Sequence, residues 1–274
     1  SGKVFGSFEG VYQVPPETLR HLQRDVVRVL VLVLVVITIT SALLYPIILA
    51  LNRGLIDLAH DLLKSNVALM TTLGSAIAQR DSDTNAHNYR VTIYAVRLAQ
   101  ALKLDQGAIR DLMAGAFLHD VGKIGISDNL LLKPGRLTDA ETLTMHTHVE
   151  RGLEIISRAE WLGAARAVIE SHHERYDGTG YPKGLKGSAI PLNARIFAIV
   201  DVFDALTSHR PYKDALPLET AMAMVRQGSG SHFDPALVRT FEDIAPRLYA
   251  EIHEADENAL KLELDGLVKT YLLS

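Results

Sequence analysis

The sequence of 274 residues contains no cysteine and one tryptophan, and it has no large excess of charge of either sign. The absence of cysteine excludes disulfides, zinc–thiolate sites, iron–sulfur clusters and cysteine nucleophiles. Lys and Arg number 28 and Asp and Glu number 32, so the formal net charge is −4. Such a small charge gives no chain-wide field for binding nucleic acid, and we expect no nucleic-acid partner. An anionic substrate would need a local positive site, such as a group of metal ions.

Hydrophobic residues make up 48% of the chain, which is too large a share for a disordered protein. The uncharged run 29–51 is long enough, as a helix, to cross the ~30 Å hydrocarbon layer of a membrane. A buried strand is the alternative because valine favours sheets, but a strand of this length would far exceed the usual size. The sequence therefore predicts a transmembrane helix over 29–51, with 1–28 as the tail of a truncated N-terminal region.

Residues 52–80 follow the apolar run and contain no proline, which favours a linker helix. The segment carries leucines at heptad-like spacing, interrupted by polar residues: Leu55, Leu58, Leu62 and Leu69. This stripe fits a contact between two copies of the chain in a homodimer, and it fits packing on the domain that follows equally well.

Residues 67–270 predict an all-α domain, because apolar residues recur at spacings of three and four. No alternation of strands and helices and no internal repeat is present. The Gly- and Pro-rich segment 175–190 predicts an irregular loop. We expect helices over 67–80, 84–102, 107–121, 138–157, 161–172, 190–208, 217–226, 234–249 and 255–272.

Histidines and aspartates stand at positions that suit a metal site. His119-Asp120 follows an apolar run, and His172-His173 precedes the Gly-rich loop. Asp201 lies within the apolar stretch 196–206, where a carboxylate is costly to bury without a cation or a paired donor. Imidazoles and carboxylates together suit iron, manganese, zinc or nickel without distinguishing among them. Two such ions would clamp phosphate oxygens and activate water, which predicts cleavage of a phosphate ester.

Two motifs resemble the HD-GYP branch of the HD phosphohydrolase superfamily. His119-Asp120 with Gly122-Lys123 is similar to the HDxGK signature, and residues 172–182, HHERYDGTGYP, resemble the HHExxDGxGYP motif. The resemblance covers residues 67–245. It implies an HD-type helical bundle with phosphodiesterase activity on the bacterial second messenger cyclic di-GMP. Linear pGpG would be the first product, and further cleavage to GMP stays open.

The resemblance also implies that two divalent ions, iron or manganese, share one bridging carboxylate, Asp120. The other side chains that would hold the ions form two sets, one of His87, His119 and Asp201 and one of His148, His172 and His173. Some members bind a third ion through a glutamate at the position of Asp83. The shorter aspartate leaves the choice between two and three ions open.

Further roles follow from the same resemblance. Lys123 matches the lysine that contacts the scissile phosphate, which makes Lys123 and Asp120 the catalytic residues. Arg210 and Lys213 match the basic pair that binds the substrate phosphates. The loop bordering the site, which the family links to partners such as diguanylate cyclases, contains Asp177, Gly178, Gly180, Tyr181 and Pro182.

The other histidines are expected to have no catalytic role. Among them, His146 would face away from His148 if residues 138–157 formed one helix.

Two other functions are not excluded by these patterns. The chain could hydrolyse another nucleotide or cyclic dinucleotide, because the spacing of motifs does not reveal the residues that line the pocket. It could also be a signalling adaptor that binds cyclic di-GMP without hydrolysis, although the complete set of ligand residues argues against this. With the predicted membrane helix, the expected location is the bacterial inner membrane, with the catalytic domain in the cytoplasm.

Overall fold

The computed structural model describes residues 10, 13–80, 85–209 and 214–273. In these ranges the chain is helical and forms no strand, apart from an isolated bridge between Ser229 and Phe233. The expectation of an all-α fold is confirmed. The chain forms two compact units, Ser1–Asp61 and Leu62–Ser274.

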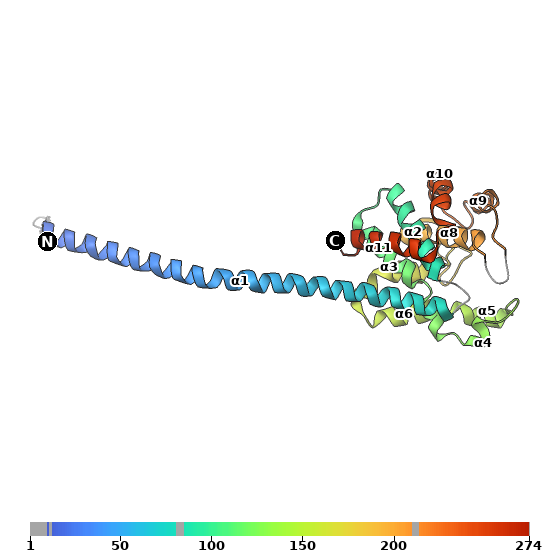
Figure 1. The fold of residues 1–274 in the computed structure, drawn as a ribbon, viewed down its shortest axis with the longest axis horizontal. Helices are drawn as coiled ribbons and strands as arrows, with labels where there is room; N and C mark the ends of the chain where they lie inside the picture. Colours follow the sequence, from blue (N-terminus) through green and yellow to red (C-terminus); the bar gives the residue numbers. More distant parts are fainter. Residues whose placement is uncertain (1–9, 11–12, 81–84, 210–213, 274) are drawn as a thin grey trace, which may run out of the picture. The chain divides into compact units, whose positions relative to one another are not determined.

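The first unit consists of the N-terminal part of α1 (Pro16–Arg80), a helix that continues through Pro46 (Figure 1). Its side chains between residues 16 and 61 are exposed. By length and composition, α1 is apolar enough to cross a membrane. One such helix is a hint of membrane anchoring, and the boundaries 29–51 and 52–80 stay predictions.

The second unit is built around α2 (Asn85–Ala101), which is buried along most of its length. Four helices pack against α2: α3 (Gln106–Leu118), α8 (Leu192–Thr207), α10 (Pro235–Ile252) and α11 (Glu257–Tyr271) (Figure 1). Residues 91–99 of α2 are apolar apart from Thr92 and Arg97, and the burial of this stretch accounts for the central position of α2.

Shorter elements connect these helices. They are η1 (Val121–Gly125), α4 (Asp128–Leu131), α5 (Asp139–His146), α6 (His148–Ser157), η2 (Glu160–Ala165), α7 (Arg166–Ser171), η3 (Gly187–Ala189) and α9 (Leu218–Gln227). The start of α5 is fixed by a capping box, in which Thr138 and Glu141 each accept a hydrogen bond from the other's backbone N–H.

The structure differs from the expected helices in three stretches. The helix predicted over 161–172 is divided between the 3-10 helix η2 and the α-helix α7. The helix predicted over 138–157 is two helices, because α5 ends at His146 and α6 begins at His148. The helix predicted over 107–121 ends at Leu118, and the chain then turns into η1. The last two interruptions border a close approach of the η1 backbone to the first turn of α6. A Cβ on Gly122 would lie 2.5 Å from the backbone nitrogen of Gly152, so the two segments touch through their main chains.

Candidate active site

Two groups of candidate metal ligands form in the described part of the chain, and within each group the ligand atoms lie within 4.8 Å of one another. The first group comes from α2, α8 and the end of α3, and the second from the turn before η1, the start of α6 and the end of α7. Their members are His87, His119 and Asp201 in the first group and Asp120, His148, His172 and His173 in the second. The structure thus brings together the side chains that the family resemblance assigned to two ions.

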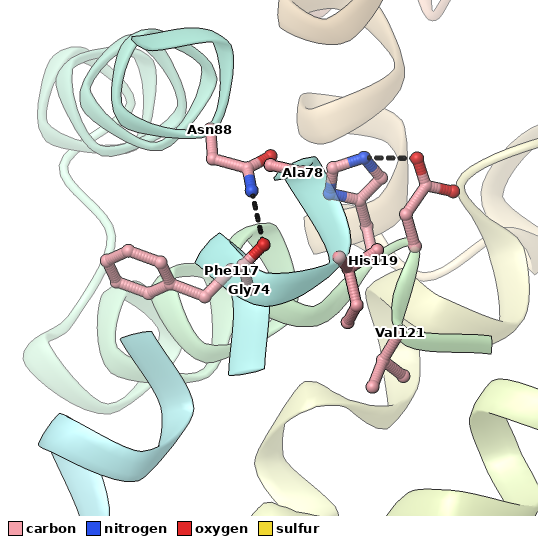
Figure 2. Close-up of a pocket in the computed structure, with 8 residues that line it drawn as sticks. Gly74, Ala78, Asn88, Phe117, His119 and Val121 are labelled. Carbon is pink, nitrogen blue, oxygen red and sulfur yellow. Dashed lines mark hydrogen bonds and ion pairs between the residues drawn. The ribbon is translucent and has the colours of Figure 1, made fainter. Parts of the chain in front are cut away.

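Asp120 lies between the two groups. Its Oδ2 is 3.1 Å from Nε2 of His119, a contact drawn in Figure 2. Its Oδ1 is 3.5 Å from Nε2 of His148 and 4.0 Å from Nε2 of His172. Two atoms that each bind one ion at ~2.1 Å can be at most ~4.2 Å apart. These separations therefore suit one ion in each group, with the Asp120 carboxylate reaching both.

Hydrogen bonds at Nδ1 orient three of these imidazoles. Nδ1 contacts a backbone carbonyl of the preceding turn at 2.8 Å in His119, 2.8 Å in His148 and 3.1 Å in His172. Because a carbonyl can only accept, Nδ1 of each ring carries a proton, and this directs Nε2 into the site. Nε2 of His148 and His172 is buried without a hydrogen-bond partner. Such orphaned lone pairs fit metal ligands, so the residues present suit a bound ion.

Burial keeps most of the imidazoles neutral. It lowers the pKa of His172 to about 3, with the neighbouring His119 acting in the same direction. Burial also lowers the pKa of His148 and of His173. In His119 burial opposes the protonated form, but the adjacent Asp120 carboxylate outweighs it and raises the pKa to about 9. A metal ion would have to displace this proton when it binds.

Lys123 lies beside the carboxylate that joins the two groups. Its Nζ is 2.6 Å from Oδ2 of Asp120, and its side chain is largely buried. Burial would raise the pKa of the Asp120 carboxyl, but the charges of Lys123 and His119 outweigh burial and hold that pKa well below its usual range. The site therefore contains an ionised carboxylate and an ammonium in direct contact.

A second carboxylate, Asp204, orients His87. Nδ1 of His87 donates to Oδ2 of Asp204 at 2.7 Å, and the Arg90 guanidinium donates to both oxygens, at 2.5 and 3.0 Å. Burial disfavours the charged carboxylate, but the hydrogen bonds from His87 and Arg90 lower the pKa of Asp204 to about 2. These contacts indicate that Asp204 orients a candidate ligand. Sequence reasoning missed Arg90, although a position three residues after His87 shares its helical face.

Replacing Asp204 by asparagine should weaken metal binding at the His87 group by about 10- to 100-fold, because partners of this kind fix the tautomer and the direction of a ligand imidazole. Calorimetric titration of Mn²⁺ into the metal-free protein measures the effect. The exposed Asp243 on α10 offers a matched control, and Asp243→Asn should bind Mn²⁺ as the wild type does. Equal affinities in the two variants would contradict the orienting role.

The Gly-rich loop is held against the site by the buried carboxylate of Glu174. This carboxylate accepts hydrogen bonds from the backbone N–H of Lys183 at 2.8 Å and of Leu185 at 2.9 Å. Gly180 approaches so closely that a Cβ there would lie 2.6 Å from the carbonyl oxygen of His173. Sequence reasoning did not single out Glu174 as a bracing residue, because its partners are backbone groups that no motif identifies.

The other loop residues shape the turn. Oδ1 of Asp177 accepts a hydrogen bond from the backbone N–H of Thr179 at 2.9 Å. Gly178 adopts a φ of +87°, a left-handed conformation that glycine takes without strain. Pro182 follows Tyr181 through a cis peptide bond.

Three of the predicted site residues, Asp83, Arg210 and Lys213, lie outside the described residues. Their roles, as a ligand of a third ion and as the phosphate-binding pair, stay predictions.

Tyr181 is the middle ring of a stack of three. Its centroid is 3.5 Å from that of His146, with 11° between the ring planes, and 4.7 Å from that of His173, with 25°. If the rings of His146 and His173 lay on the same face of Tyr181 at these distances, they would overlap. They therefore cover opposite faces of Tyr181. The expectation that His146 faces away from His148 depended on one helix over 138–157, and that helix is interrupted at Thr147. His146 instead supports a ring that packs on a candidate ligand.

We expect His146→Ala to lower the free energy of unfolding by about 1 kcal/mol, since a stacked aromatic pair contributes about 0.5–1.5 kcal/mol. For a unit of this size the melting temperature should fall by roughly 2–4 °C. His146→Phe keeps a ring at this position and should melt close to the wild type. Thermal unfolding of the three proteins in EDTA makes the comparison, and an unchanged melting temperature in His146→Ala would argue against the stack.

Comparisons with known proteins agree with this geometry. The HD domain family matches residues 71–237. A cyclic di-GMP phosphodiesterase of Vibrio cholerae serotype O1 is 43% identical over 192 residues, covering 64% of this chain and 39% of that protein. The cyclic di-GMP phosphodiesterase response regulator RpfG of Xanthomonas campestris pv. campestris is 41% identical over 192 residues, covering 69% and 51%. The 3'3'-cGAMP-specific phosphodiesterase 2 of Vibrio cholerae is 40% identical over 185 residues, covering 67% and 35%.

Among solved structures, the cyclic GMP-AMP-specific phosphodiesterase V-cGAP3 of V. cholerae superposes with a TM-score of 0.57. It is 22% identical in sequence, and the match covers 71% of this chain and 52% of that one, which shows the fold alone. The chain spans 39% and 51% of the lengths of the two cyclic di-GMP relatives. Since the family match covers more than half of the sequence, the chain belongs to the HD domain family, and its residues 172–182 carry the motif of the HD-GYP branch.

Proposed function

We propose that this chain is a metal-dependent phosphodiesterase that hydrolyses cyclic di-GMP, with linear pGpG as the first product and further cleavage to GMP left open. The observation that carries the proposal is the position of the Asp120 carboxylate, whose two oxygens each face imidazole nitrogens of a different ligand group. The names of two relatives that are 43% and 41% identical, both cyclic di-GMP phosphodiesterases, support the choice of substrate.

The chain's own residues supply the positioning that this chemistry needs. Divalent ions held by the two groups would provide a water of lowered pKa and positive charge for phosphate oxygens. The hydrogen bonds at Nδ1 of His87, His119 and His148 keep each Nε2 directed into the site. We assign the Lys123 ammonium to the scissile phosphate, where it would stabilise the charge that develops as the 3′ oxygen leaves. Arg210 and Lys213 are assigned to the substrate phosphates by resemblance.

The number and the identity of the ions form part of the proposal. We propose two ions, iron or manganese, and a third if the Asp83 carboxylate reaches the first group. Elemental analysis of protein purified without oxygen should give about two metal ions per chain if Asp83 does not contribute, because each ligand group suits one ion.

Hydrolysis of cyclic di-GMP by the purified chain in Mn²⁺ or Fe²⁺ tests the function. The wild type should release pGpG, and the double variant His119→Ala/Asp120→Ala should release none. Product formation by the double variant would overturn the assignment, and binding without turnover by the wild type would favour a signalling adaptor. The 40% identity to a 3'3'-cGAMP-specific phosphodiesterase makes 3'3'-cGAMP the second candidate substrate. The ratio of kcat/KM for the two dinucleotides decides between them.

We infer that α1 anchors the chain in the bacterial inner membrane, with the catalytic unit in the cytoplasm. The support for the anchor is the apolar run of α1. We also propose that a second copy of the chain contacts the leucines exposed beyond the run, such as Leu55 and Leu58. A diguanylate cyclase is the proposed partner of the Gly-rich loop. Membrane fractionation of the expressed chain tests the anchor, and recovery in the soluble fraction would contradict it.

A further inference from the structure

The last turn of α1 is joined by a single guanidinium to the turn that carries Lys123. Nη1 of Arg80 donates to the carbonyl oxygens of Lys123 at 3.0 Å and of Ile124 at 2.7 Å, and Nη2 donates to that of Ile126 at 2.6 Å. Nε donates to Oδ1 of Asp128 at 2.9 Å. One side chain therefore contacts η1, the residue after it and the start of α4.

The main-chain contacts distinguish this arrangement from a surface ion pair. The Asp128 side chain is 66% exposed, and an exposed pair of this kind contributes little to stability. The carbonyl contacts of Arg80 to Lys123 and Ile126 are partly buried. The planar guanidinium has five donors in a fixed fork, whereas the ammonium of lysine is a compact group that cannot span three carbonyls. The position is thus matched to arginine.

Two more contacts hold the same end of α1 against segments that carry ligands (Figure 2). Nδ2 of Asn88, the residue after His87, donates to the carbonyl oxygen of Gly74 at 3.1 Å. Gly74 itself packs on the end of α3, where a Cβ would lie 2.7 Å from the carbonyl oxygen of Phe117. Met70 and Ile77 of α1 are buried. The end of α1 is therefore fixed to the two segments that carry His87 and His119.

We propose that Arg80 is a positioning residue that holds the Asp120–Lys123 turn in its reactive arrangement. The Lys123 ammonium lies 2.6 Å from Asp120, and Arg80 fixes the backbone from which that ammonium extends. A misplacement of about 1 Å in a reactive group can cost about 100-fold in rate. The effect on rate rests on the proposed phosphodiesterase function.

Kinetics of the full chain in detergent micelles with Mn²⁺ test the proposal. Arg80→Ala should lower kcat by about 10- to 100-fold, because the turn loses the guanidinium that donates hydrogen bonds to its carbonyl oxygens. KM and metal content should stay close to wild type, since no ligand is removed. Arg80→Lys should fall between Arg80→Ala and the wild type. Asp128→Ala removes only the exposed ion pair and should keep kcat within about twofold of wild type. Wild-type kcat in Arg80→Ala, or an equal loss in Asp128→Ala, would overturn the proposal.

Hydrogen exchange separates this proposal from the function on which it rests, because it needs no substrate. Amides of residues 121–126 should exchange faster in Arg80→Ala than in the wild type, while those of α8 should not change. Arg247→Ala is the matched control, since Arg247 pairs with Glu251 on the surface of α10. Unchanged exchange at 121–126 would overturn the positioning role. Absence of turnover by the wild type would overturn only the assigned reaction. If Arg80→Ala does not fold, Arg80→Lys replaces it in the comparison.

Discussion

Asp120→Asn is expected to reduce hydrolysis of cyclic di-GMP by about 1,000-fold or more, since the loss of bound metal removes several kcal/mol of transition-state stabilisation. The cause lies in the two-sided position of the carboxylate. Oδ2 faces His119 and Oδ1 faces His148 and His172, so the amide changes the ligand set of both groups. It also removes the negative charge beside Lys123. We therefore expect both ions to bind more weakly, and elemental analysis together with kcat in Mn²⁺ measures the two effects.

Asp201→Asn is the matched comparison, because Asp201 belongs to the first group alone and lies 3.6 Å from Nε2 of His87. This variant should lose the ion of the first group and retain the ion held by His148, His172 and His173. The difference between the two variants is the signature of a bridging carboxylate. If Asp120→Asn kept both ions, or lost the same single ion as Asp201→Asn, Asp120 would not join the groups.

The helices of this protein were predictable because their signal is local. Apolar spacing of three and four residues marks α2 and α8, and the predicted ranges differ from the observed ones by one or two residues at each end. The pair Asp201 and Asp204 illustrates how far such reasoning extends. A spacing of three places both carboxylates on one face of α8, but only the tertiary structure shows that they contact opposite nitrogens of His87.

The interruptions at Leu118 and Thr147 were not predictable, and both border a contact between η1 and α6, which are distant in the sequence. No propensity in residues 138–157 requires the break between α5 and α6. Arg80 and Glu174 escaped prediction for a related reason. Both act on backbone groups, which carry no signature in the sequence of the partner segment.

The contact between η1 and α6 leads to the second large effect, that of Gly122→Ala. A Cβ at this position would lie 2.7 Å from the carbonyl carbon of His148 and 2.5 Å from the backbone nitrogen of Gly152. Backbone atoms cannot rotate away as a flexible side chain can, so η1 and α6 must separate. Overpacking of this kind costs about 3 kcal/mol or more, which should lower the melting temperature by roughly 6–12 °C. Since His148 and Lys123 stand on the two separated segments, kcat should fall by about 100-fold as well.

Gly266→Ala provides the control, because Gly266 lies exposed within α11 and an added Cβ meets no atom within 4 Å. Alanine should there stabilise the helix by about 0.5–1 kcal/mol. Melting is compared in EDTA, since a bound ion raises the melting temperature by mass action and would mix the loss of metal with the loss of packing. A Gly122→Ala protein that melts with the wild type would mean that η1 and α6 can move apart freely. The backbone contact would then not be what sets the distance between Lys123 and the imidazole of His148.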